Sequence, residues 1–559
     1  MPKHKIAYFS MEIGLNEEMP TYAGGLGVLA GDTLRAAADW GLSLVAVTLV
    51  HRKGYFRQHL DAKGTQTEEP DSWSPERHLR ELEPRVDVEV GNKRVRLRAW
   101  SKEIEGVLGD VVPVIFLDAD LEANDARARA LTDSLYGGDH HYRLSQEVIL
   151  GVGGIRMLQA LGYKGIETYH MNEGHAGLLT FELISQAAQA AGRAAPTAKD
   201  IAWVRERCVF TTHTPVAAGH DLFGAEVVEG VLGADAWKRL RELDSWSEPN
   251  VIELNMTELA LRHSRYVNGV ARRHGDVTRE MFEGYDVAAI TNGVHAATWT
   301  SPAFQKLFDR HIPGWREDNQ SLRYVAYIPL EEIRLAHQDA KRALLEHIKQ
   351  SNGITFDENQ FTIGFARRST AYKRADLLFH DIDRLNRIAA ELGPIQIIYA
   401  GKAHPRDSRG KEIIRRIVAA KESLSEQIQL AYLEDYGMKL GALLTSGTDL
   451  WLNNPEPPKE ASGTSGMKAA LNGVPSLSVL DGWWIEGHIE GVTGWSIAGP
   501  NSGAQDLYSK LETSILPLFY DDPEGYAQTR RHAISLNGSF FNTERMVNEY
   551  ARRAYRHSH

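Results

Sequence analysis

The chain has 559 residues, 43% of them hydrophobic and 25% charged, with a formal net charge of −11 at pH 7. This composition excludes a disordered chain, and the acidic excess argues against a general nucleic-acid binder. Its one cysteine, Cys208, excludes an internal disulfide framework and any zinc site built from several cysteines. The length predicts two or more domains. Because no apolar run reaches membrane-spanning length and no signal-peptide core opens the sequence, we expect a cytoplasmic location.

Short apolar runs that end in small or polar residues recur along the chain, and helix-like segments follow many of them. This alternation is typical of parallel sheets with crossover helices, so the sequence predicts an α/β fold. Residues 85–100 alternate apolar and charged side chains about Gly91-Asn92, which predicts a hairpin insertion. In chain order, we expect strands at residues 5–10, 42–50, 111–117, 166–171, 207–213, 287–293, 360–366, 395–401, 428–433, 448–453 and 475–480.

A charged, helix-like stretch at residues 315–349 separates the two series of strands. We therefore predict two domains, residues 1–295 and residues 296–559. Two doubly wound domains would face each other across a cleft, and ligands of such folds bind outside the carboxyl ends of the strands.

A glycine-rich turn follows the first predicted strand in "YAGGLGVLAGD". Its glycines, Gly24, Gly25 and Gly27, do not have the spacing of the dinucleotide-binding fingerprint. They would let the backbone approach a phosphate or a sugar closely, although a turn made only for packing has the same signature.

Isolated polar residues stand at the ends of three first-half strands. They are Asn172, Glu173 and His175 in "MNEGH", His213 in "TTHT" and Asn292 in "ITNG". A lone histidine at such a place is more often structural than functional. Three such sites at the carboxyl ends of parallel strands would nevertheless line one cleft.

Four cations, Arg367, Arg368, Lys373 and Arg374, follow the first strand of the second half in "FARRSTAYKRAD". Guanidinium and ammonium groups at a strand's carboxyl end in an acidic protein suggest an oxyanion pocket. The alternative is a solvated helix start.

The segment "EASGTSGMKAALNG", residues 460–473, places a glycine loop before a helix, with Lys468 at the junction. Such a loop favours a phosphate, and a nearby amine suits a ligand that also carries an aldehyde, which describes pyridoxal phosphate. A helix-start lysine that points at water is the alternative. We expect no metal site and no serine-nucleophile triad, because the sequence has no HExxH motif and no G-x-S-x-G elbow around Ser462 or Ser465.

Taken together, "YFSME", "AGGLG", "MNEGH", "THT", "TNG", "RRSTAYKR" and "EASGTSGMKAALNG" resemble, in this order, the α-glucan phosphorylases, the family of glycogen, starch and maltodextrin phosphorylases. The resemblance runs from the first strand to at least Asp481. It implies two Rossmann-like domains in the GT-B arrangement, with the last helix crossing back to the first domain. A homodimer is usual in that family.

The resemblance also implies roles for individual residues. Lys468 would carry pyridoxal 5'-phosphate, and the cofactor pocket would include Thr464, Ser465, Arg367 and Tyr436. Arg368 and Lys373 would bind the substrate phosphate with backbone N–H groups of Gly24 and Gly25. Glu460, His213 and Asn292 would contact the transferred glucosyl unit, and Asp139 and His175 would lie at the gate and the acceptor side. The groups expected to act in catalysis are Lys468, Arg368, Lys373 and His213.

The implied reaction is phosphorolysis of the terminal α-1,4-linked glucose of glycogen or maltodextrin, giving glucose 1-phosphate with retention. Two phosphates in one dry site would repel each other, which raises their proton affinity. The chain departs from the long phosphorylases at Thr370 and Ala371, where they have His-Glu, at Glu173 and Gly174, and at Gly437. It also begins at the first strand, so it resembles the short prokaryotic type, and control through an N-terminal extension is not expected.

The sequence is compatible with two other functions. A nucleotide-sugar glucosyltransferase of the same fold would carry a second glutamate eight positions after Glu460, where this chain has Lys468. A catalytically silent glucan-binding protein would keep the fold and bind oligosaccharide without releasing glucose 1-phosphate.

Overall fold

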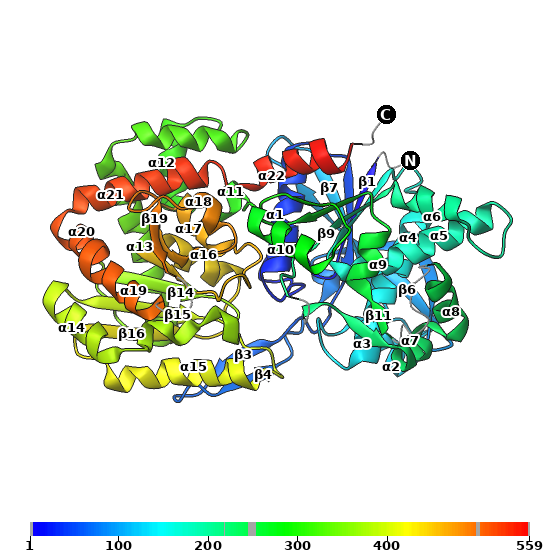
Figure 1. Ribbon diagram of the computed structural model, residues 1–559, viewed down its shortest axis with the longest axis horizontal. Helices are drawn as coiled ribbons and strands as arrows, with labels where there is room; N and C mark the ends of the chain where they lie inside the picture. The colour runs from blue at the N-terminus through cyan, green and yellow to red at the C-terminus, as the bar shows by residue number, and fades with distance from the viewer. Residues whose placement is uncertain (1–3, 217–218, 244–252, 499–502, 557–559) are drawn as a thin grey trace.

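The computed structural model describes residues 4–216, 219–243, 253–498 and 503–556. Two large sheets, each covered by helices, lie side by side along the long axis of the molecule (Figure 1). The α/β fold with two doubly wound halves is confirmed. No helix in the described ranges has the length and apolar character needed to cross a membrane.

Over the described ranges the first sheet has nine strands. The first seven in spatial order run parallel, and the eighth and then the ninth are added by antiparallel pairing. Its central strands are fully buried apolar runs, which is what a sheet covered on both faces requires. The spatial order is β13 (Val287–Ala289), β12 (Tyr266–Gly269), β9 (Cys208–Thr211), β8 (Thr168–Asn172), β1 (Ile6–Ser10), β2 (Leu44–Leu49), β7 (Val111–Asp118), β6 (Lys93–Glu105) and β5 (Arg80–Val90).

The hairpin predicted around Gly91-Asn92 is present, but it is not a separate insertion. Strands β5 and β6 pair on either side of this turn, and β6 pairs with β7, so the hairpin extends the main sheet. Gly91 and Asn92 both have positive φ, at 60° and 59°, as a tight two-residue turn between twisted strands requires.

Ten helices of the first half pack on this sheet or beside it: α1 (Gly25–Asp39), α2 (Ala126–Arg129), α3 (His140–Val148), α4 (Gly154–Ala160), α5 (Leu178–Ala190), α6 (Ala198–Arg205), α7 (Ala225–Leu232), α8 (Ala234–Leu243), α9 (Met256–Arg262) and α10 (Arg272–Met281), counted over the described ranges. Two short antiparallel pairs complete this half: β3 (Arg57–Leu60) with β4 (Gln66–Glu69), and β10 (Leu222–Gly224) with β11 (Glu253–Asn255).

The second sheet has six parallel strands. Numbered from its own first strand, its spatial order is 3-2-1-4-5-6, the order of the doubly wound nucleotide-binding folds. The strands are β16 (Ile428–Leu433), β15 (Ile395–Ala400), β14 (Phe361–Ala366), β17 (Leu450–Asn453), β18 (Ser476–Val479) and β19 (Gly494–Ile497). Sequence reasoning missed β12 and β19, because both are four-residue strands that begin or end in glycine.

The helices of the second half are α11 (Ala296–Trp299), α12 (Pro302–His311), α13 (Leu330–Asn352), α14 (Ile382–Leu392), α15 (Ser408–Ala420), α16 (Met438–Gly447), α17 (Ser465–Leu471), α18 (Trp484–Gly487), α19 (Gly503–Lys510), α20 (Leu516–Asp521), α21 (Pro523–His532) and α22 (Thr543–Glu549). The predicted helical stretch before β14 corresponds mainly to α13. The domain boundary after residue 295 stays a prediction.

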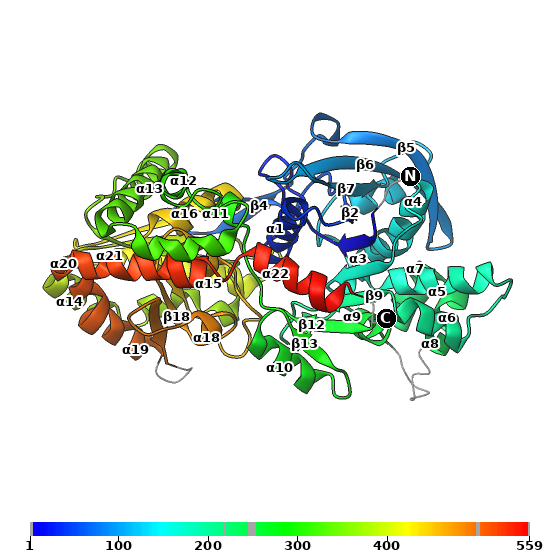
Figure 2. The same cartoon turned by 90° about the horizontal axis from the view of Figure 1, so that it is seen from above.

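The end of the chain lies against the first sheet, where α22 packs beside α1 (Figure 2). Arg545 of α22 donates to the carbonyl oxygens of Thr291 (2.7 Å) and Asn292 (2.9 Å). Beyond α22, the Tyr555 hydroxyl lies 2.8 Å from His170 Nδ1. The C-terminal segment therefore holds the loop that follows β13.

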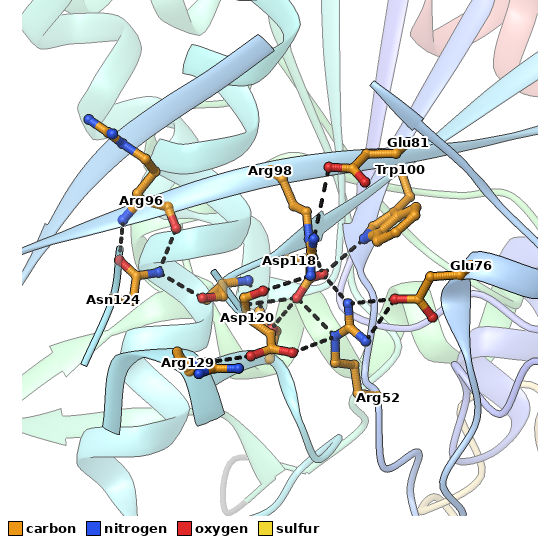
Figure 3. A network of polar contacts seen from close by, with 12 residues as sticks. Arg52, Glu76, Glu81, Arg96, Arg98, Trp100, Asp118, Asp120, Asn124 and Arg129 are labelled. Carbon is orange, nitrogen blue, oxygen red and sulfur yellow. Dashed lines mark hydrogen bonds and ion pairs between the residues drawn. The ribbon is translucent and has the colours of Figure 1, made fainter. Parts of the chain in front are cut away.

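Asp118, at the end of β7, is the centre of a polar network in the first half (Figure 3). Its fully buried carboxylate accepts hydrogen bonds from Arg52 (2.7 Å), Arg98 (2.7 Å) and Trp100 (2.9 Å). Burial opposes ionisation, but the charge and hydrogen bond of Arg52, helped by the hydrogen bond from Trp100, keep the pKa of Asp118 below its usual value. This network fixes the segment after β7, which continues to Tyr136 in the cleft described next.

Candidate active site

A cleft of about 590 Å³ lies between the two sheets, and both halves of the chain line it. In each sheet the strand order reverses its direction between two neighbouring strands. These neighbours are β1 and β8 in the first sheet, and β14 and β17 in the second. Ligands of doubly wound folds bind beyond the carboxyl ends of strands at such switch points. The loops that follow these four strands supply most of the predicted site residues.

Lys468 lies on α17 with its side chain buried and lines the cleft. Its Nζ stands 3.4 Å from the centre of the Trp299 ring and makes no hydrogen bond to any residue that the structure describes. Burial lowers the pKa of Lys468 to about 8. The surface-lysine alternative is therefore wrong, and this amine is partly uncharged, and so nucleophilic, near neutral pH.

The loop before Lys468 also lines the cleft, through Gly463, Thr464 and Ser465. Gly463 has a φ of +78°, and a Cβ there would stand 3.5 Å from the Arg367 guanidinium, so the loop backbone lies against this cation. Ser465 Oγ accepts a hydrogen bond of 3.1 Å from Trp451 Nε1, which leaves its proton free to donate to a ligand.

Glu460 connects the loop before Lys468 to the loop of residues 367–374, which we call the cationic loop. Its carboxylate forms ion pairs with Arg367, at 2.8 Å, and with Lys373, and all three side chains are more than nine-tenths buried. Burial opposes ionisation, but the two cations lower the pKa of Glu460 to about 2. Two positive charges facing one carboxylate leave a net positive group beside Lys468, which suits an anion.

The other two cations of the loop differ from each other. Arg368 is exposed to the cleft and forms neither a hydrogen bond nor an ion pair with the described part of the chain, so its guanidinium is available to a ligand. Arg374 instead donates to the carbonyl oxygens of Asn454 (2.9 Å) and Pro455 (3.0 Å) and does not line the cleft. The grouping of all four cations in one oxyanion pocket is therefore wrong for Arg374.

The glycine turn begins α1 and faces the cleft from the first half. Gly24 and Gly25 line the cleft, and a Cβ at either position would meet nothing within 4 Å. The N–H of Gly24 already donates to Glu12 Oε2 (3.2 Å), as does that of Ala23 (2.6 Å). Of the two N–H groups predicted to bind phosphate, only that of Gly25 has no such partner in the described residues. Sequence reasoning missed Glu12, although it belongs to "YFSME".

The polar residues after β8 and β9 form one connected group. His213 Nε2 lies 2.7 Å from Asn172 Oδ1, and the His213 backbone N–H donates to Glu173 (2.8 Å). Burial lowers the pKa of His213 to about 4, so the imidazole is neutral at pH 7. Because an amide oxygen faces Nε2, this nitrogen carries the proton, and Nδ1 is left as an acceptor.

His175 lies on the other side of Glu173 and pairs with Asp221, at 3.1 Å. Burial opposes protonation, but Asp221 and Glu173 raise the pKa of His175 above its ordinary value. Asp221 also pairs with Arg143. These charged groups form one wall of the cleft.

A profile of the family described as "Carbohydrate phosphorylase" matches residues 220–492. The chain is 37% identical to a glycogen phosphorylase of Mycobacterium tuberculosis, over 98% of this chain and 70% of that protein. It is 36% identical to a maltodextrin phosphorylase of Thermococcus litoralis, with the same two coverages, and 32% identical to a glycogen phosphorylase of Aquifex aeolicus, over 99% of this chain and 86% of that protein.

The chain belongs to the carbohydrate phosphorylase family. The resemblance read from the motifs is thereby confirmed. The chain is also 29% identical to an uncharacterized protein of Methanocaldococcus jannaschii over 98% of this chain and 99% of that protein.

The remaining predicted residues of this phosphorylase-family chain take different positions. Asn292 lines the cleft, and its buried Oδ1 has no hydrogen-bond partner among the described residues, which leaves an acceptor for a ligand. Tyr436 lines the cleft, and burial raises the pKa of its hydroxyl to about 12, so it stays protonated and can donate. Asp139 is exposed and caps α3 by accepting from the Tyr142 N–H (2.9 Å); it is not among the residues that line the cleft.

Several cleft residues had no role in the sequence-based prediction. Besides Glu12, they include Tyr55, Tyr136, Arg143, Asp221, Trp299, Tyr372, Lys402, His404 and Arg406. Tyr372, Lys402, His404 and Arg406 follow β14 or β15, as Glu12 follows β1, and this is a signal that could have been used. Tyr55 lies in an irregular connection and Trp299 ends the short helix α11, and no local pattern at either place indicates a site.

Proposed function

We propose that this chain is a pyridoxal phosphate-dependent α-glucan phosphorylase that releases glucose 1-phosphate from the non-reducing end of glycogen or maltodextrin, with retention of configuration. The observation that carries the proposal is the buried amine of Lys468, whose pKa is about 8, in a cleft that also presents the guanidinium of Arg368, which no described residue pairs with. A nucleotide-sugar enzyme has no need for such an amine at this position.

The residues present fit the cofactor. Lys468 would attach its aldehyde carbon, and Arg367, Thr464 and Ser465 would hold its phosphate, since all of them line one side of the cleft. Tyr436 would donate from the same wall. When bound, the cofactor supplies a phosphate group that can hold or return a proton close to the substrate phosphate.

The chain's own residues would bind the two substrates. Arg368 would hold the incoming phosphate with the Gly25 N–H across the cleft. His213, neutral and accepting at Nδ1, would take a hydrogen bond from a glucosyl hydroxyl, and Asn292 would offer its free Oδ1 to another. Inorganic phosphate would give its proton to the leaving glycosidic oxygen, so the charged walls need only position it and exclude water.

Glu460 and Lys373 would change partners during this binding. A phosphate near Arg368 competes with the Glu460 carboxylate for Lys373, because both anions need the same ammonium group. The released carboxylate oxygen would then be available to the glucosyl unit. Glu460 thus acts as a stand-in anion that keeps the cations oriented until phosphate arrives.

The first test is an absorbance spectrum of the purified protein before and after borohydride reduction, with peptide mapping of the labelled lysine. We expect a reduced pyridoxyl group on Lys468. Absence of a chromophore that added pyridoxal phosphate fails to restore would contradict the cofactor assignment.

The second test is turnover of maltodextrin with inorganic phosphate, followed as release of glucose 1-phosphate. ADP-glucose without phosphate serves as the control substrate. Glucosyl transfer from ADP-glucose would indicate the glucosyltransferase, and oligosaccharide binding without release of glucose 1-phosphate would indicate a silent glucan-binding protein.

A further inference from the structure

The hairpin of β3 and β4 belongs to the first half of the chain but lies against the second half, beside α15 (Figure 1). At its tip, Gly64 packs on Val418 of α15, where a Cβ would stand only 2.8 Å from the valine side chain. Glu68 of β4 pairs with Lys411 of α15 at 2.6 Å. The hairpin thus connects the first half of the molecule to the second, and we call residues 57–69 the strap.

Two buried glutamines fasten the strap. Gln58 is 0% exposed and Gln66 is 5% exposed, and Gln58 Nε2 donates to Gln66 Oε1 (2.8 Å). Gln58 also donates to the carbonyl oxygen of Gly401 (3.0 Å) and accepts from the Asp435 N–H (3.0 Å). Gln66 donates to the carbonyl oxygen of Ala403 (2.8 Å) and accepts from its N–H (3.0 Å). Each amide therefore bonds the backbone of the second half through both its oxygen and its nitrogen.

The backbone segment at residues 400–403, to which these glutamines bond, also bonds directly to the cationic loop. The N–H of Arg367 donates to the carbonyl oxygen of Ala400 (3.2 Å), and that of Ser369 donates to the carbonyl oxygen of Lys402 (2.9 Å). Gly401 has a φ of +147°, and a Cβ there would stand 1.9 Å from the Arg367 carbonyl oxygen. The backbone of Arg367 and Arg368 therefore lies in close contact with residues that the strap holds.

We propose that Gln58 and Gln66 are positioning residues that set the separation between the cations of the second half and the glycine turn of the first, and thereby the affinity for phosphate. The inference rests on the proposed function. The two groups expected to hold one phosphate, Arg368 and the Gly25 N–H, come from different halves. The strap is a connection of buried, directional hydrogen bonds between those halves, and a site made from two bodies binds tightly only when their separation is fixed.

The chain offers a matched control in Gln396, at the beginning of β15. Like the two strap glutamines it is buried, and it bonds the backbone of the second half through both amide atoms, here at Asp357 (2.6 and 2.9 Å). It lies at the end of the strand opposite the cleft. A loss of stability alone would therefore affect Gln396→Met and Gln66→Met alike, whereas a loss of positioning would affect only the latter.

The experiment measures the phosphate concentration that half-saturates the stabilisation of the cofactor-loaded enzyme against heat, for wild type, Gln58→Met, Gln66→Met and Gln396→Met. We expect this concentration to rise about tenfold in the two strap variants and to stay within about twofold of wild type in Gln396→Met. An unchanged phosphate affinity in folded Gln66→Met, or an equal rise in Gln396→Met, would overturn the proposal.

A milder variant covers the case in which the buried substitutions prevent folding. Glu68 pairs with Lys411 and its Oε1 also accepts from Gln66 Nε2 (2.6 Å), so Glu68→Gln removes the partly exposed charge but keeps an oxygen that can accept from Gln66. We expect it to raise the half-saturating phosphate concentration about twofold. An affinity equal to that of wild type would count against the strap.

This experiment measures phosphate binding without turnover, so a failure of the proposed function can be distinguished from a failure of the positioning proposal. If wild type binds phosphate but releases no glucose 1-phosphate, the phosphorylase assignment fails while the role of the strap is still decided by the variants. If phosphate does not stabilise wild type at all, the positioning proposal fails.

Discussion

The Lys468 ammonium nitrogen lies 3.4 Å from the centre of the Trp299 indole ring, in a buried position where no described residue offers it a hydrogen bond. An indole face stabilises the charged amine only weakly compared with water, so desolvation prevails and the pKa of Lys468 falls to about 8. Desolvation therefore leaves the amine partly uncharged near neutral pH, even though the nearby charge of Asp32 acts to raise its pKa.

The first prediction concerns the pH dependence of cofactor attachment. Only the uncharged amine attacks an aldehyde, so the rate at which the cofactor-free protein takes up pyridoxal phosphate should rise about tenfold per pH unit below pH 8 and then level off. Stopped-flow absorbance measurements between about pH 6 and 9.5 would give the rate of cofactor uptake at each pH. A rate that still climbs steeply at the upper limit would indicate an ordinary lysine and contradict the burial argument. Lys468→Ala should fold and take up no cofactor.

The second prediction separates two arginines of one loop. Arg368 is exposed to the cleft and pairs with no residue of the described ranges. Arg368→Ala should therefore raise the KM for phosphate by about 30-fold to 100-fold, the value of one or two charged hydrogen bonds, and leave the melting temperature unchanged. Arg374→Ala should do the opposite, because Arg374 holds the carbonyl oxygens of Asn454 and Pro455. Steady-state kinetics and thermal unfolding of both variants check the contrast. Similar effects of the two substitutions would refute it.

Much of this arrangement could be predicted from local sequence. Buried apolar runs identify the central strands of parallel sheets, and polar residues that follow them, such as Glu460 and His213, necessarily gather at one edge. The motif around Lys468 identified the family because its glycines and its lysine recur at fixed spacing.

Contacts between distant parts of the chain could not be predicted in this way. Nothing near Gln66 in the sequence indicates that it bonds Ala403, and nothing near Asn292 indicates that Arg545 holds its carbonyl oxygen. Arg374 misled for a related reason: its φ of 46° turns it away from the cleft, and backbone conformation of this kind leaves no signal in a run of cations.

The third prediction concerns Glu460 as a stand-in anion. Glu460→Gln leaves Arg367 and Lys373 buried without their carboxylate, which should lower the free energy of unfolding by about 3 kcal/mol in a buffer without phosphate or sulfate. Phosphate should recover more stability in this variant than in wild type, because it no longer competes with Glu460. Urea unfolding with and without phosphate measures both effects. Glu456→Gln, whose partly exposed pair with Lys459 lies four residues away, is the matched control.

The contribution of the Glu460 pairs should also depend on pH with a definite sign. The folded pKa of about 2 lies below the ordinary glutamate value near 4.3, so the stabilisation is present above the ordinary value and is lost as the pH falls from there toward 2. The difference between wild type and Glu460→Gln should therefore shrink in acid. A difference independent of pH, or an equal loss with and without phosphate, would show that the carboxylate charge is not what Glu460 contributes.

The last prediction concerns the support of the cleft by Asp118. Asp118→Asn keeps the shape of the side chain but leaves Arg52 and Arg98 facing an uncharged amide, so we expect the free energy of unfolding to fall by about 3 kcal/mol at pH 7. Glu167→Gln is the control, because Glu167 pairs with Lys5 (2.9 Å) outside this network where both side chains are exposed, and its loss should cost less than about 1 kcal/mol. Denaturant unfolding of the two variants gives both free energies.

The contribution of Asp118 should also depend on pH. Because the folded pKa of Asp118 is lowered, its contribution to stability is lost as the pH falls through the acid range, and the stabilities of the two variants relative to wild type should converge there. Equal losses for the two variants at pH 7 would mean that the buried network adds no more to stability than a surface ion pair does.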